Sequence, residues 1–387
     1  MDFGLTEEQC MVQEMTRAFA EKELAPVASR LDRDGAYPHE QLKKLGEMGL
    51  MGVFVPEEFG GAGMDFLSYV TALEEVSKAW ASLGTILSVN NSLVCGPIFR
   101  FGSDAQKKRY LPLVARGEWL GCYALTEAGA GSDAGSIRTR AVRINGGYVL
   151  NGSKVFTTNG SQANLAIVYA VTDATQGKQG ISAFLVERGT PGFVVGKIED
   201  KLGLRSSQTA ALSFEDCRVP LENLLGREGE GFRIALETLD GGRIGIATQA
   251  VGIAQACIEE SLSYSKERQQ FGRPIADFQA IQWMLADMAT EIDAARLLTY
   301  RAAWLHEQGR EVTRAAAMAK LFASEACNRA AYKALQIFGG YGYIKDFAVE
   351  RLFRDARVTT LYEGTSEIQR LIIARHLLRD GERWDDA

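Results

Sequence analysis

The pattern of apolar and polar positions changes twice along the chain and divides it into three regions. From Thr6 to about Glu118, apolar residues recur at helical spacing. The run Thr6-Glu7-Glu8-Gln9 predicts a capping box, in which the side chains of Thr6 and Gln9 each accept a hydrogen bond from the other residue's backbone. Gly46, Gly49 and a Gly-Gly-Ala-Gly turn at 60–63 divide the region into several helices. We therefore predict an N-terminal helical domain over residues 1–119.

The second region, residues 120–225, has short runs of β-branched and aromatic residues that predict strands. The clearest of these runs are Leu165–Val171, Ile181–Val186 and Ala210–Phe214. A shorter strand, 148–150, lies between two turn signals, Asn145-Gly146 and Asn151-Gly152. Because short strands follow one another without intervening helices, we predict an antiparallel β-sandwich or barrel.

The third region, residues 226–387, returns to helical spacing with longer helices. One apolar face runs through Ile244, Ala247, Val251, Ala254, Ile258 and Leu262, and a second through Ile281, Met284, Leu285, Met288, Ile292, Ala295 and Leu298. Further helices are predicted at 315–335 and 365–378, and short connections favour antiparallel neighbours. The predicted fold is therefore an α+β multidomain protein with a C-terminal four-helix bundle.

Composition limits the classes of partner. The 387 residues are 46% hydrophobic and 24% charged with a net charge of −6, which argues against nucleic acid or an anionic membrane as the main partner. Uninterrupted apolar stretches are only a few residues long, and residues 1–8 do not resemble a secretory signal. The six cysteines and three histidines are dispersed, so we expect no metal site.

Two glycine-rich segments are candidate ligand loops. Residues 129–134, Gly-Ala-Gly-Ser-Asp-Ala, fit the dinucleotide fingerprint as a string, but residues 137–143 then read as a strand where that fingerprint requires a helix. We therefore exclude a Rossmann unit; the loop either presents backbone N–H groups to a ligand or simply closes the β domain. The segment Gln336–Tyr343 is either a tight turn between helices or a close approach of backbone to a flat ligand.

The segment Leu361–Gln369 predicts a helix start, with Ser366 and Gln369 as a capping box. Glu363 comes just before this start. A carboxylate near a helix N-terminus is stabilised by about 0.3–1 kcal/mol, and most such residues have no further role. Charge and capping alone do not mark Glu363 as catalytic.

Taken in order, these segments resemble the acyl-CoA dehydrogenase family, and especially its short-chain, butyryl-CoA branch. The resemblance extends over nearly the whole chain, to about Leu378. Its most specific segments are 123–136 (YALTEAGAGSDAGS) and 336–355 (QIFGGYGYIKDFAVERLFRD), and 238–245, 267–275 and 361–370 add three further matches. The resemblance implies a helical domain, a central β domain, a C-terminal four-helix bundle, and FAD bound without a Rossmann unit.

The resemblance also assigns residues to the expected site. The residues expected to contact FAD are Tyr123, Leu125, Thr126, Ser132, Phe156, Thr157, Thr158, Thr365 and Glu367. A second group is expected to reach the dinucleotide of a neighbouring subunit: Arg268, Phe271, Gln279, Gln336, Gly339 and Gly340. Acyl-CoA contacts are expected at Ser132, Asp240, Arg243, Tyr362 and Gly364. By analogy, residues 89–98 and 240–251 line the acyl tunnel, although plain core packing explains the first segment equally well.

In this branch the glutamate of Tyr-Glu-Gly-Thr is the base that removes the α-proton of the acyl thioester, which assigns that role to Glu363. Some relatives place the base on the helix matching about 240–245, but here that site carries Gly241-Gly242. Hydrogen bonds to the thioester carbonyl are expected to make the α-proton more acidic, and burial is expected to raise the pKa of Glu363 and make it a stronger base. The implied reaction is oxidation of a short- to medium-chain acyl-CoA to the trans-2-enoyl-CoA, with a hydride passing from the β-carbon to the flavin.

The resemblance further implies an electron-transferring flavoprotein as the electron acceptor, a homotetramer, and the bacterial cytoplasm as location, with the mitochondrial matrix as the alternative. The sequence leaves three other functions open. An oxidase would pass its electrons to oxygen, an enoyl-CoA reductase would run the reaction in reverse, and a non-catalytic flavin-binding relative would serve assembly. A hydrolase is disfavoured because the sequence has no G-x-S-x-G elbow.

Overall fold

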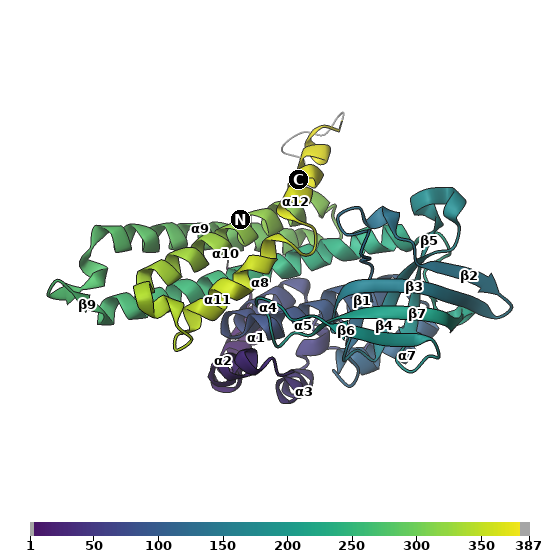
Figure 1. Ribbon diagram of the computed structural model, residues 1–387, viewed down its shortest axis with the longest axis horizontal. Helices are drawn as coiled ribbons and strands as arrows, with labels where there is room; N and C mark the ends of the chain where they lie inside the picture. The colour runs from purple at the N-terminus through teal and green to yellow at the C-terminus, as the bar shows by residue number, and fades with distance from the viewer. Residues whose placement is uncertain (1–3, 380–387) are drawn as a thin grey trace.

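The first region folds into α-helices in the computed structural model, which describes residues 4–379 (Figure 1). These helices are α1 (Glu7–Phe19), α2 (Ala25–Asp34), α3 (His39–Glu47), α4 (Phe66–Ala79), α5 (Ala81–Ser88), α6 (Gly96–Phe101) and α7 (Asp104–Ala115). The predicted capping box before α1 is confirmed, since the side chains of Thr6 and Gln9 each accept from the other's backbone. Residues 1–3 and 380–387, at the outer ends of the two predicted helical domains, lie outside the described residues.

A π-helix, Val89–Cys95, joins α5 to α6 and makes one continuous apolar run. By length and composition the run Ala81–Phe101 could cross a membrane, the one such helix among residues 4–379. However, 89% of its most apolar window is buried inside the protein. This is the burial expected of a core helix. The run is longer and more apolar than the sequence analysis expected, but it lies inside the protein.

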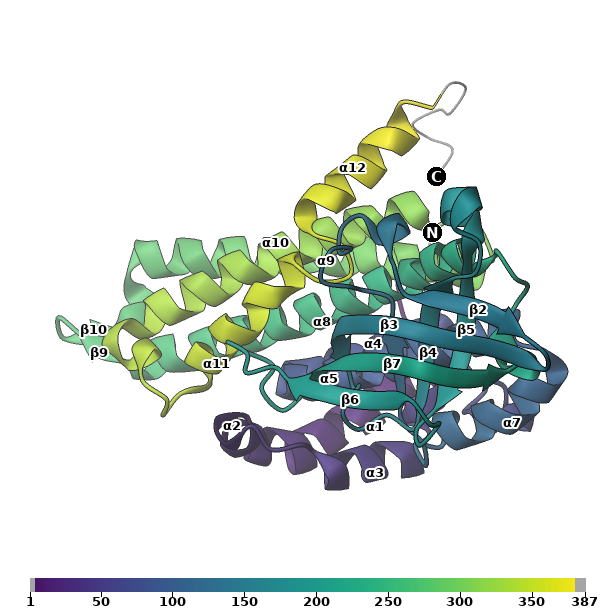
Figure 2. The same cartoon turned by 45° about the vertical axis from the view of Figure 1, so that its right-hand side comes forward.

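The second region forms one eight-stranded sheet (Figure 2). Its strands are β1 (Gly121–Ala124), β2 (Arg140–Ile144), β3 (Gly147–Thr158), β4 (Leu165–Val171), β5 (Ile181–Glu187), β6 (Phe193–Ile198), β7 (Thr209–Pro220) and β8 (Leu224–Leu225). They follow the order β6-β7-β3-β2-β4-β5-β8, with β1 also paired to β4. Most pairs are antiparallel as predicted, but β1 and β2 both run parallel to β4, so the sheet is mixed.

The two Asn-Gly signals have different outcomes. Asn145-Gly146 forms the predicted hairpin turn between β2 and β3, with Gly146 at φ 83°. Asn151-Gly152 is not a turn, because β3 continues through it to Thr158. A β-bulge in the pairing with β7 occurs here, and a side chain at Gly152 would lie 2.5 Å from the Thr139 hydroxyl. The glycine therefore relieves crowding within a strand instead of reversing the chain.

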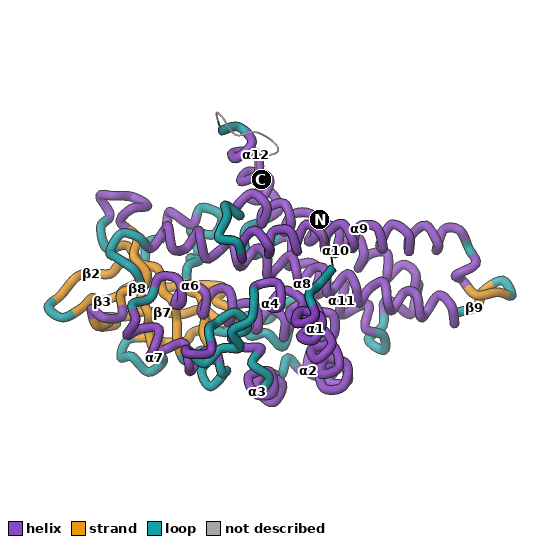
Figure 3. The backbone as a smooth tube through the Cα atoms, turned by 180° about the vertical axis from the view of Figure 1, so that it is seen from behind, coloured by secondary structure: helices purple, strands orange, loops and turns teal. Residues whose placement is uncertain are grey.

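The third region forms the long helices α8 (Gly231–Glu267), α9 (Gln279–Glu307), α10 (Thr313–Phe338), α11 (Ala348–Ala356) and α12 (Ser366–Leu377). Helix α8 packs against α9 and α10 of the bundle and against α4 of the first region, so both helical regions share one core. Seen from behind, the strands gather at one end of the molecule and a small hairpin, β9 (Gln269–Gln270) with β10 (Arg273–Pro274), marks the other (Figure 3). The predicted fold class is confirmed.

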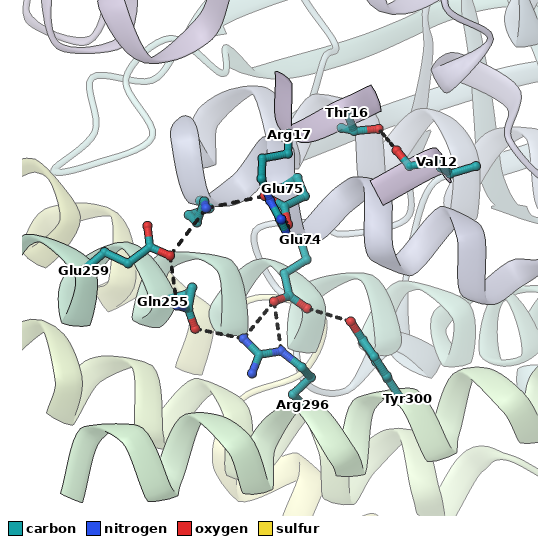
Figure 4. Close-up of polar contacts among 10 residues, drawn as sticks. Val12, Thr16, Arg17, Glu74, Glu75, Gln255, Glu259, Arg296 and Tyr300 are labelled. Atoms are coloured by element: carbon teal, nitrogen blue, oxygen red, sulfur yellow. Dashed lines mark hydrogen bonds and ion pairs between the residues drawn. The ribbon is translucent and has the colours of Figure 1, made fainter. Parts of the chain in front are cut away.

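A network of polar side chains joins α1, α4, α8 and α9 (Figure 4). The Glu74 carboxylate accepts from Arg296 Nε at 3.0 Å and from the Tyr300 hydroxyl at 3.2 Å. Its neighbour Glu75 accepts from Arg17 Nη2 at 2.7 Å. Both glutamates are buried, so these partners compensate for the loss of hydration.

Candidate active site

Glu363 lies in the turn between the 3₁₀ segment Arg357–Thr360 and helix α12. Its φ is 53° and that of Gly364 is 87°, so the turn contains two consecutive left-handed residues. The N-cap of α12 is Thr365, whose hydroxyl accepts from Ile368 N at 3.3 Å, and not Ser366 as predicted. The capping box is therefore wrong by one residue, because Gln369 donates to the turn carbonyls instead of returning a bond to the cap.

The carboxylate of Glu363 points toward helix α8. Its Oε2 is inaccessible to solvent and has no hydrogen-bond partner among the described residues, although the residue as a whole is only partly buried. A side chain built on Gly242 would lie 2.6 Å from this oxygen and 2.9 Å from Leu93 of the π-helix. Gly242 thus provides the space that the Glu363 carboxylate occupies, which explains a glycine in the middle of a long helix.

Burial raises the pKa of Glu363 from an ordinary 4.5 to about 7, and the positive charges of Arg243 and Lys320 oppose that rise. Desolvation therefore dominates over two neighbouring cations. A carboxylate with a pKa near neutral pH is a stronger base than an ordinary glutamate.

Asp240 and Arg243 form a buried ion pair one turn apart on α8. Asp240 also accepts from the Thr313 hydroxyl at 2.7 Å, while burial raises the pKa of its carboxyl. Arg243 Nε has no hydrogen-bond acceptor in the described part of the chain. Arg243 directly follows Gly242, which faces the Glu363 carboxylate, and its positive charge opposes the rise in the Glu363 pKa.

Two fully buried polar residues that contact the Glu363 turn are not among the residues predicted from the sequence. Lys320 of α10 is fully buried and donates to the Gly364 carbonyl at 2.8 Å. Gln369 of α12 is also fully buried and donates to the carbonyls of Glu363 and Gly364 at 2.9 and 3.0 Å. A signal existed for Lys320, since it lies on the alanine face between Ala316 and Ala323, where a charge needs a reason.

Strand β1 and the loop after it carry three of the predicted cofactor residues, Tyr123 in the strand and Leu125 and Thr126 in the loop. The fully buried Lys154 of β3 donates to the Leu125 carbonyl at 3.0 Å and to Glu127 Oε1 at 2.8 Å. Val155 N donates to the Thr126 carbonyl at 2.9 Å. The structure thus brings this loop and the end of β3 together, and Lys154 is a further residue that sequence analysis missed.

The end of β3 carries the predicted residues Phe156, Thr157 and Thr158. Phe156 has a left-handed φ of 54°, lies in a register shift between β3 and β7, and leaves its side chain 67% exposed. The Thr157 hydroxyl is buried without a hydrogen-bond partner in the described structure. Ser132 is exposed, and side chains built on Gly129 and Gly131 would meet no atom within 4 Å. This edge of the sheet therefore offers an exposed ring, an unpartnered hydroxyl and accessible backbone.

The remaining predicted residues fall into two groups. Tyr362, Gly364, Thr365 and the exposed Glu367 lie in the Glu363 turn or in the first turn of α12. The other group lies at the opposite end of the bundle, around the β9–β10 hairpin, and most of its members are exposed (Figure 1): Arg268, Phe271, Gln279, Gln336, Gly339 and Gly340. A single chain does not bring this second group to the Glu363 site.

Comparison with known proteins gives three consecutive family matches: the N-terminal domain of acyl-CoA dehydrogenase at residues 6–118, the middle domain at 122–217 and the C-terminal domain at 229–378. An acyl-CoA dehydrogenase of Bacillus subtilis (strain 168) is 54% identical over 97% of this chain and 99% of its own length. The mitochondrial short-chain specific acyl-CoA dehydrogenase of Mus musculus is 53% identical over 97% and 91%. An acryloyl-CoA reductase (NADH) of Anaerotignum propionicum is 49% identical over 98% and 96%.

Two solved structures are similarly close. A chain in a structure described as the electron transferring flavoprotein of Acidaminococcus fermentans superposes with a TM-score of 0.97 at 52% identity, covering 98% of this chain and 100% of that one. Butyryl-CoA dehydrogenase from Megasphaera elsdenii superposes with a TM-score of 0.96 at 46% identity, over the same shares of both chains.

Proposed function

Because the chain belongs to the acyl-CoA dehydrogenase family, we propose that it oxidises a short- to medium-chain acyl-CoA to the trans-2-enoyl-CoA, with Glu363 as the α-proton base. The observation that carries this proposal is the solvent-inaccessible Oε2 of Glu363, which has no hydrogen-bond partner among residues 4–379 and faces Gly242. An unpartnered buried carboxylate is costly, and such groups concentrate where chemistry needs them.

The α-proton of a thioester is too weakly acidic for an ordinary carboxylate in water, so both acidities must change. Burial raises the pKa of Glu363 to about 7 and makes it a stronger base. The backbone N–H of Glu363 makes no hydrogen bond to a residue in the described range 4–379. It is therefore free to donate to the thioester carbonyl, where it would stabilise the charge that develops as the proton leaves.

FAD fits the edge of the sheet described above. The accessible backbone of the loop at 125–132, the unpartnered Thr157 hydroxyl and the exposed Phe156 ring are the groups that would bind it, together with Tyr123, Thr158, Thr365 and Glu367. When bound, FAD supplies the acceptor for the hydride that leaves the β-carbon. Lys154 and Glu127 fix the loop before the cofactor arrives, which reduces the ordering that binding requires.

The acyl-CoA contacts are proposed at Ser132, Asp240, Arg243, Tyr362 and Gly364. Arg243, with its unsatisfied Nε, is the group in this set that would attract an anionic or strongly polar part of the ligand. The π-helix Val89–Cys95 is buried and contacts the space around Gly242, so it would form part of the tunnel wall. Straight, branched and cyclic acyl groups are all compatible with the proposal.

We further propose a homotetramer that passes electrons to an electron-transferring flavoprotein in the bacterial cytoplasm. The residues around the β9–β10 hairpin lie far from the Glu363 turn in one chain (Figure 1). They would serve the dinucleotide of a neighbouring subunit, as the family resemblance implies. Sedimentation at several concentrations tests the tetramer, and steady-state turnover with the flavoprotein compared with oxygen tests the acceptor.

The direct test of the base is Glu363→Gln, which keeps the shape of the side chain and removes the proton acceptor. We expect anaerobic reduction of the bound flavin by butyryl-CoA to fall by at least about 10³-fold, with the yellow cofactor retained. Glu260→Gln is the control, because Glu260 is a partly buried carboxyl on α8 roughly 27 Å of helix away from Gly242. Reduction of the Glu363→Gln flavin at the wild-type rate would exclude Glu363 as the base.

A second function is favoured by one relative, the acryloyl-CoA reductase. The same residues would catalyse the reverse reaction, adding a proton at the α-carbon from Glu363. Rates of butyryl-CoA oxidation and crotonyl-CoA reduction, measured with electron carriers of different potential, distinguish the two directions. Faster reduction at physiological potentials would assign the chain as a reductase.

A further inference from the structure

The turn that carries Glu363 is conformationally unusual. Glu363 adopts a left-handed φ of 53°, a region that a residue with a side chain seldom occupies, and Gly364 follows at 87°. Left-handed pairs of this kind persist where surrounding contacts stabilise them. The contacts on this turn are therefore informative about how the carboxylate is aimed.

Two buried side chains supply those contacts. Gln369 Nε2 donates to the carbonyl oxygens of both Glu363 and Gly364, at 2.9 and 3.0 Å. Lys320 Nζ donates to the Gly364 carbonyl at 2.8 Å. Gln369 also explains the glycine, because a side chain at Gly364 would lie 2.7 Å from its Nε2. Both carbonyls of the turn are thus bound by donors from different helices, α10 and α12.

Lys320 is unusual for a buried cation. It is fully buried, and within residues 4–379 no carboxylate lies within ion-pair distance of its Nζ. Its ammonium instead binds a neutral carbonyl beside Glu363 and attracts the Glu363 carboxylate through space. A neutral donor could make the same contact to the Gly364 carbonyl without the cost of burying a charge. We therefore expect the positive charge of Lys320 to have a role of its own, namely its attraction for the Glu363 carboxylate.

We propose that Lys320 and Gln369 are positioning residues that keep the Glu363–Gly364 turn left-handed, so that the carboxylate faces Gly242 with the Lys320 ammonium bound to the adjacent carbonyl. The proposal rests on the proposed role of Glu363 as the base. Neither residue needs to touch the substrate, since both act through the two carbonyls and through charge.

Other groups near Glu363 must be considered in any pH measurement. Arg243 faces it from α8, and Lys320 from α10, and both favour the ionised carboxylate. Burial lowers the pKa of Lys320 itself to about 8, although the charges of Glu363, Glu325 and Glu367 oppose this, so Lys320 is fully charged only well below that pH. The tyrosines that sense the Glu363 charge are Tyr69 on α4, Tyr123 on β1 and Tyr362 next to it in the chain. Their pKa values are all raised, so they stay neutral over the range of the experiment.

The experiment compares three variants of the holoenzyme. Lys320→Met removes charge and donor while keeping an unbranched side chain, Gln369→Met removes two hydrogen bonds without changing charge, and Lys333→Met is the control. Lys333 lies on the same helix and is paired with Asp287 at 2.9 Å, away from the Glu363 turn. Each is measured for flavin content, melting temperature, and the pH dependence of anaerobic flavin reduction by butyryl-CoA.

For Lys320→Met and Gln369→Met we expect the limiting reduction rate to fall about 10- to 100-fold per bound flavin, with substrate affinity changed far less. In Lys320→Met alone the acid limb of the profile should move upward by about one pH unit, because a charge that favours ionised Glu363 is lost. Lys333→Met should leave both quantities unchanged.

Three outcomes overturn the proposal. Wild-type reduction rates per flavin in both Lys320→Met and Gln369→Met would show that their hydrogen bonds to the Glu363–Gly364 turn are not needed. A slower Lys320→Met enzyme whose acid limb stays in place, or a loss of melting temperature alone, would reduce Lys320 to a structural contact. Glu363→Gln separates the two levels: if it reduces flavin normally, the proposed function fails; if it is inactive while Lys320→Met and Gln369→Met are normal, only this inference fails.

Discussion

Two glutamates beside helix α8, Glu74 and Glu363, have buried carboxylate oxygens with opposite surroundings. Glu74 accepts hydrogen bonds from Arg296 and Tyr300, so both of its oxygens have partners (Figure 4). Within residues 4–379, Glu363 has neither a hydrogen bond to its buried Oε2 nor an ion pair, although the charges of Arg243 and Lys320 act on it through space. Burial raises the pKa of both carboxyls.

The difference separates a group that builds the fold from one that is kept available. Partners on Glu74 compensate for its desolvation and tie α4 to α9. The same partners on Glu363 would lower its basicity and occupy the lone pairs that a proton must reach. The structure leaves the Glu363 carboxyl without such compensation at the position where the proposed reaction needs a base.

The largest expected effect is that substitution of Glu363 abolishes activity, whereas substitution of Glu74 lowers stability. Glu363→Gln should abolish flavin reduction while leaving the fold intact. Glu74→Gln should leave the reduction rate within about twofold but lower the free energy of unfolding by about 1–3 kcal/mol, because Arg296 loses its buried counter-charge. Stopped-flow reduction and denaturant unfolding of both variants check this. Equal loss of activity in the two would contradict the distinction.

Two glycines on α8 allow the same comparison with one added methyl group. In Gly242→Ala the methyl would meet the movable end of the Glu363 side chain at 2.6 Å, so the carboxylate must shift. We expect the reduction rate to fall about 10- to 100-fold with little change in stability.

Gly252→Ala is the matched control, because there the methyl would meet the backbone carbonyl of Glu74 at 2.6 Å and the Lys78 backbone nitrogen at 2.9 Å. Since backbone cannot move aside cheaply, the free energy of unfolding should fall by about 1–3 kcal/mol with the rate per folded molecule unchanged. Slow reduction by this variant would show that α8 glycines affect activity in general.

A pH series sharpens the comparison through stability. The pKa of Glu363 is about 7 in the folded protein against an ordinary 4.5, so the folded state binds the extra proton between these values. Its contribution to stability is present below pH 4.5 and is lost as the pH rises through 7.

The Glu363→Gln variant cannot ionise at this position, so its stability does not fall in this way as the pH rises. It should match the wild type near pH 5 and exceed it by roughly 1–3 kcal/mol at pH 8, measured by denaturant unfolding at each pH. A difference that does not depend on pH would mean that Glu363 is not desolvated in solution.

The smallest expected effect concerns Lys154, which fixes the loop after β1 through Leu125 and Glu127. Lys154→Met should weaken FAD binding about tenfold, because the loop must then be ordered when the cofactor binds. Fluorescence titration of the apoprotein with FAD measures this, with Lys333→Met as the control. Unchanged FAD affinity would show that β3 alone orders the loop.

Local pattern was sufficient to predict much of the fold. Strands β4 and β5 lie within a residue of their predicted bounds, because continuous β-branched runs buried on both faces have a distinctive pattern. The parallel pairing of β1 with β4 was not predicted, since it joins segments more than 40 residues apart. Asn151-Gly152 was misread because the crowding that requires its glycine comes from Thr139 on another segment.

The site was only partly predictable for the same reason. The sequence marks Glu363 only as a carboxylate before a helix, and the family resemblance supplied its role. The carbonyls that Lys320 and Gln369 bind belong to a turn whose left-handed conformation no periodicity reveals. Lys154 was likewise invisible, since its partners on the β1 loop become neighbours only in the sheet.

Helix α8 is unbroken from Gly231 to Glu267 and contacts both glutamates' surroundings, through Gly242 and Gly252. Each residue inserted into such a helix turns everything beyond it by about 100°. A one-residue insertion between these glycines, whatever its identity, would therefore turn either Gly242 away from Glu363 or Gly252 away from the α4 backbone. The length of α8 thus fixes the relative orientation of Gly242 and Gly252. Insertions and deletions in this protein should be confined to loops such as the exposed segment 174–179.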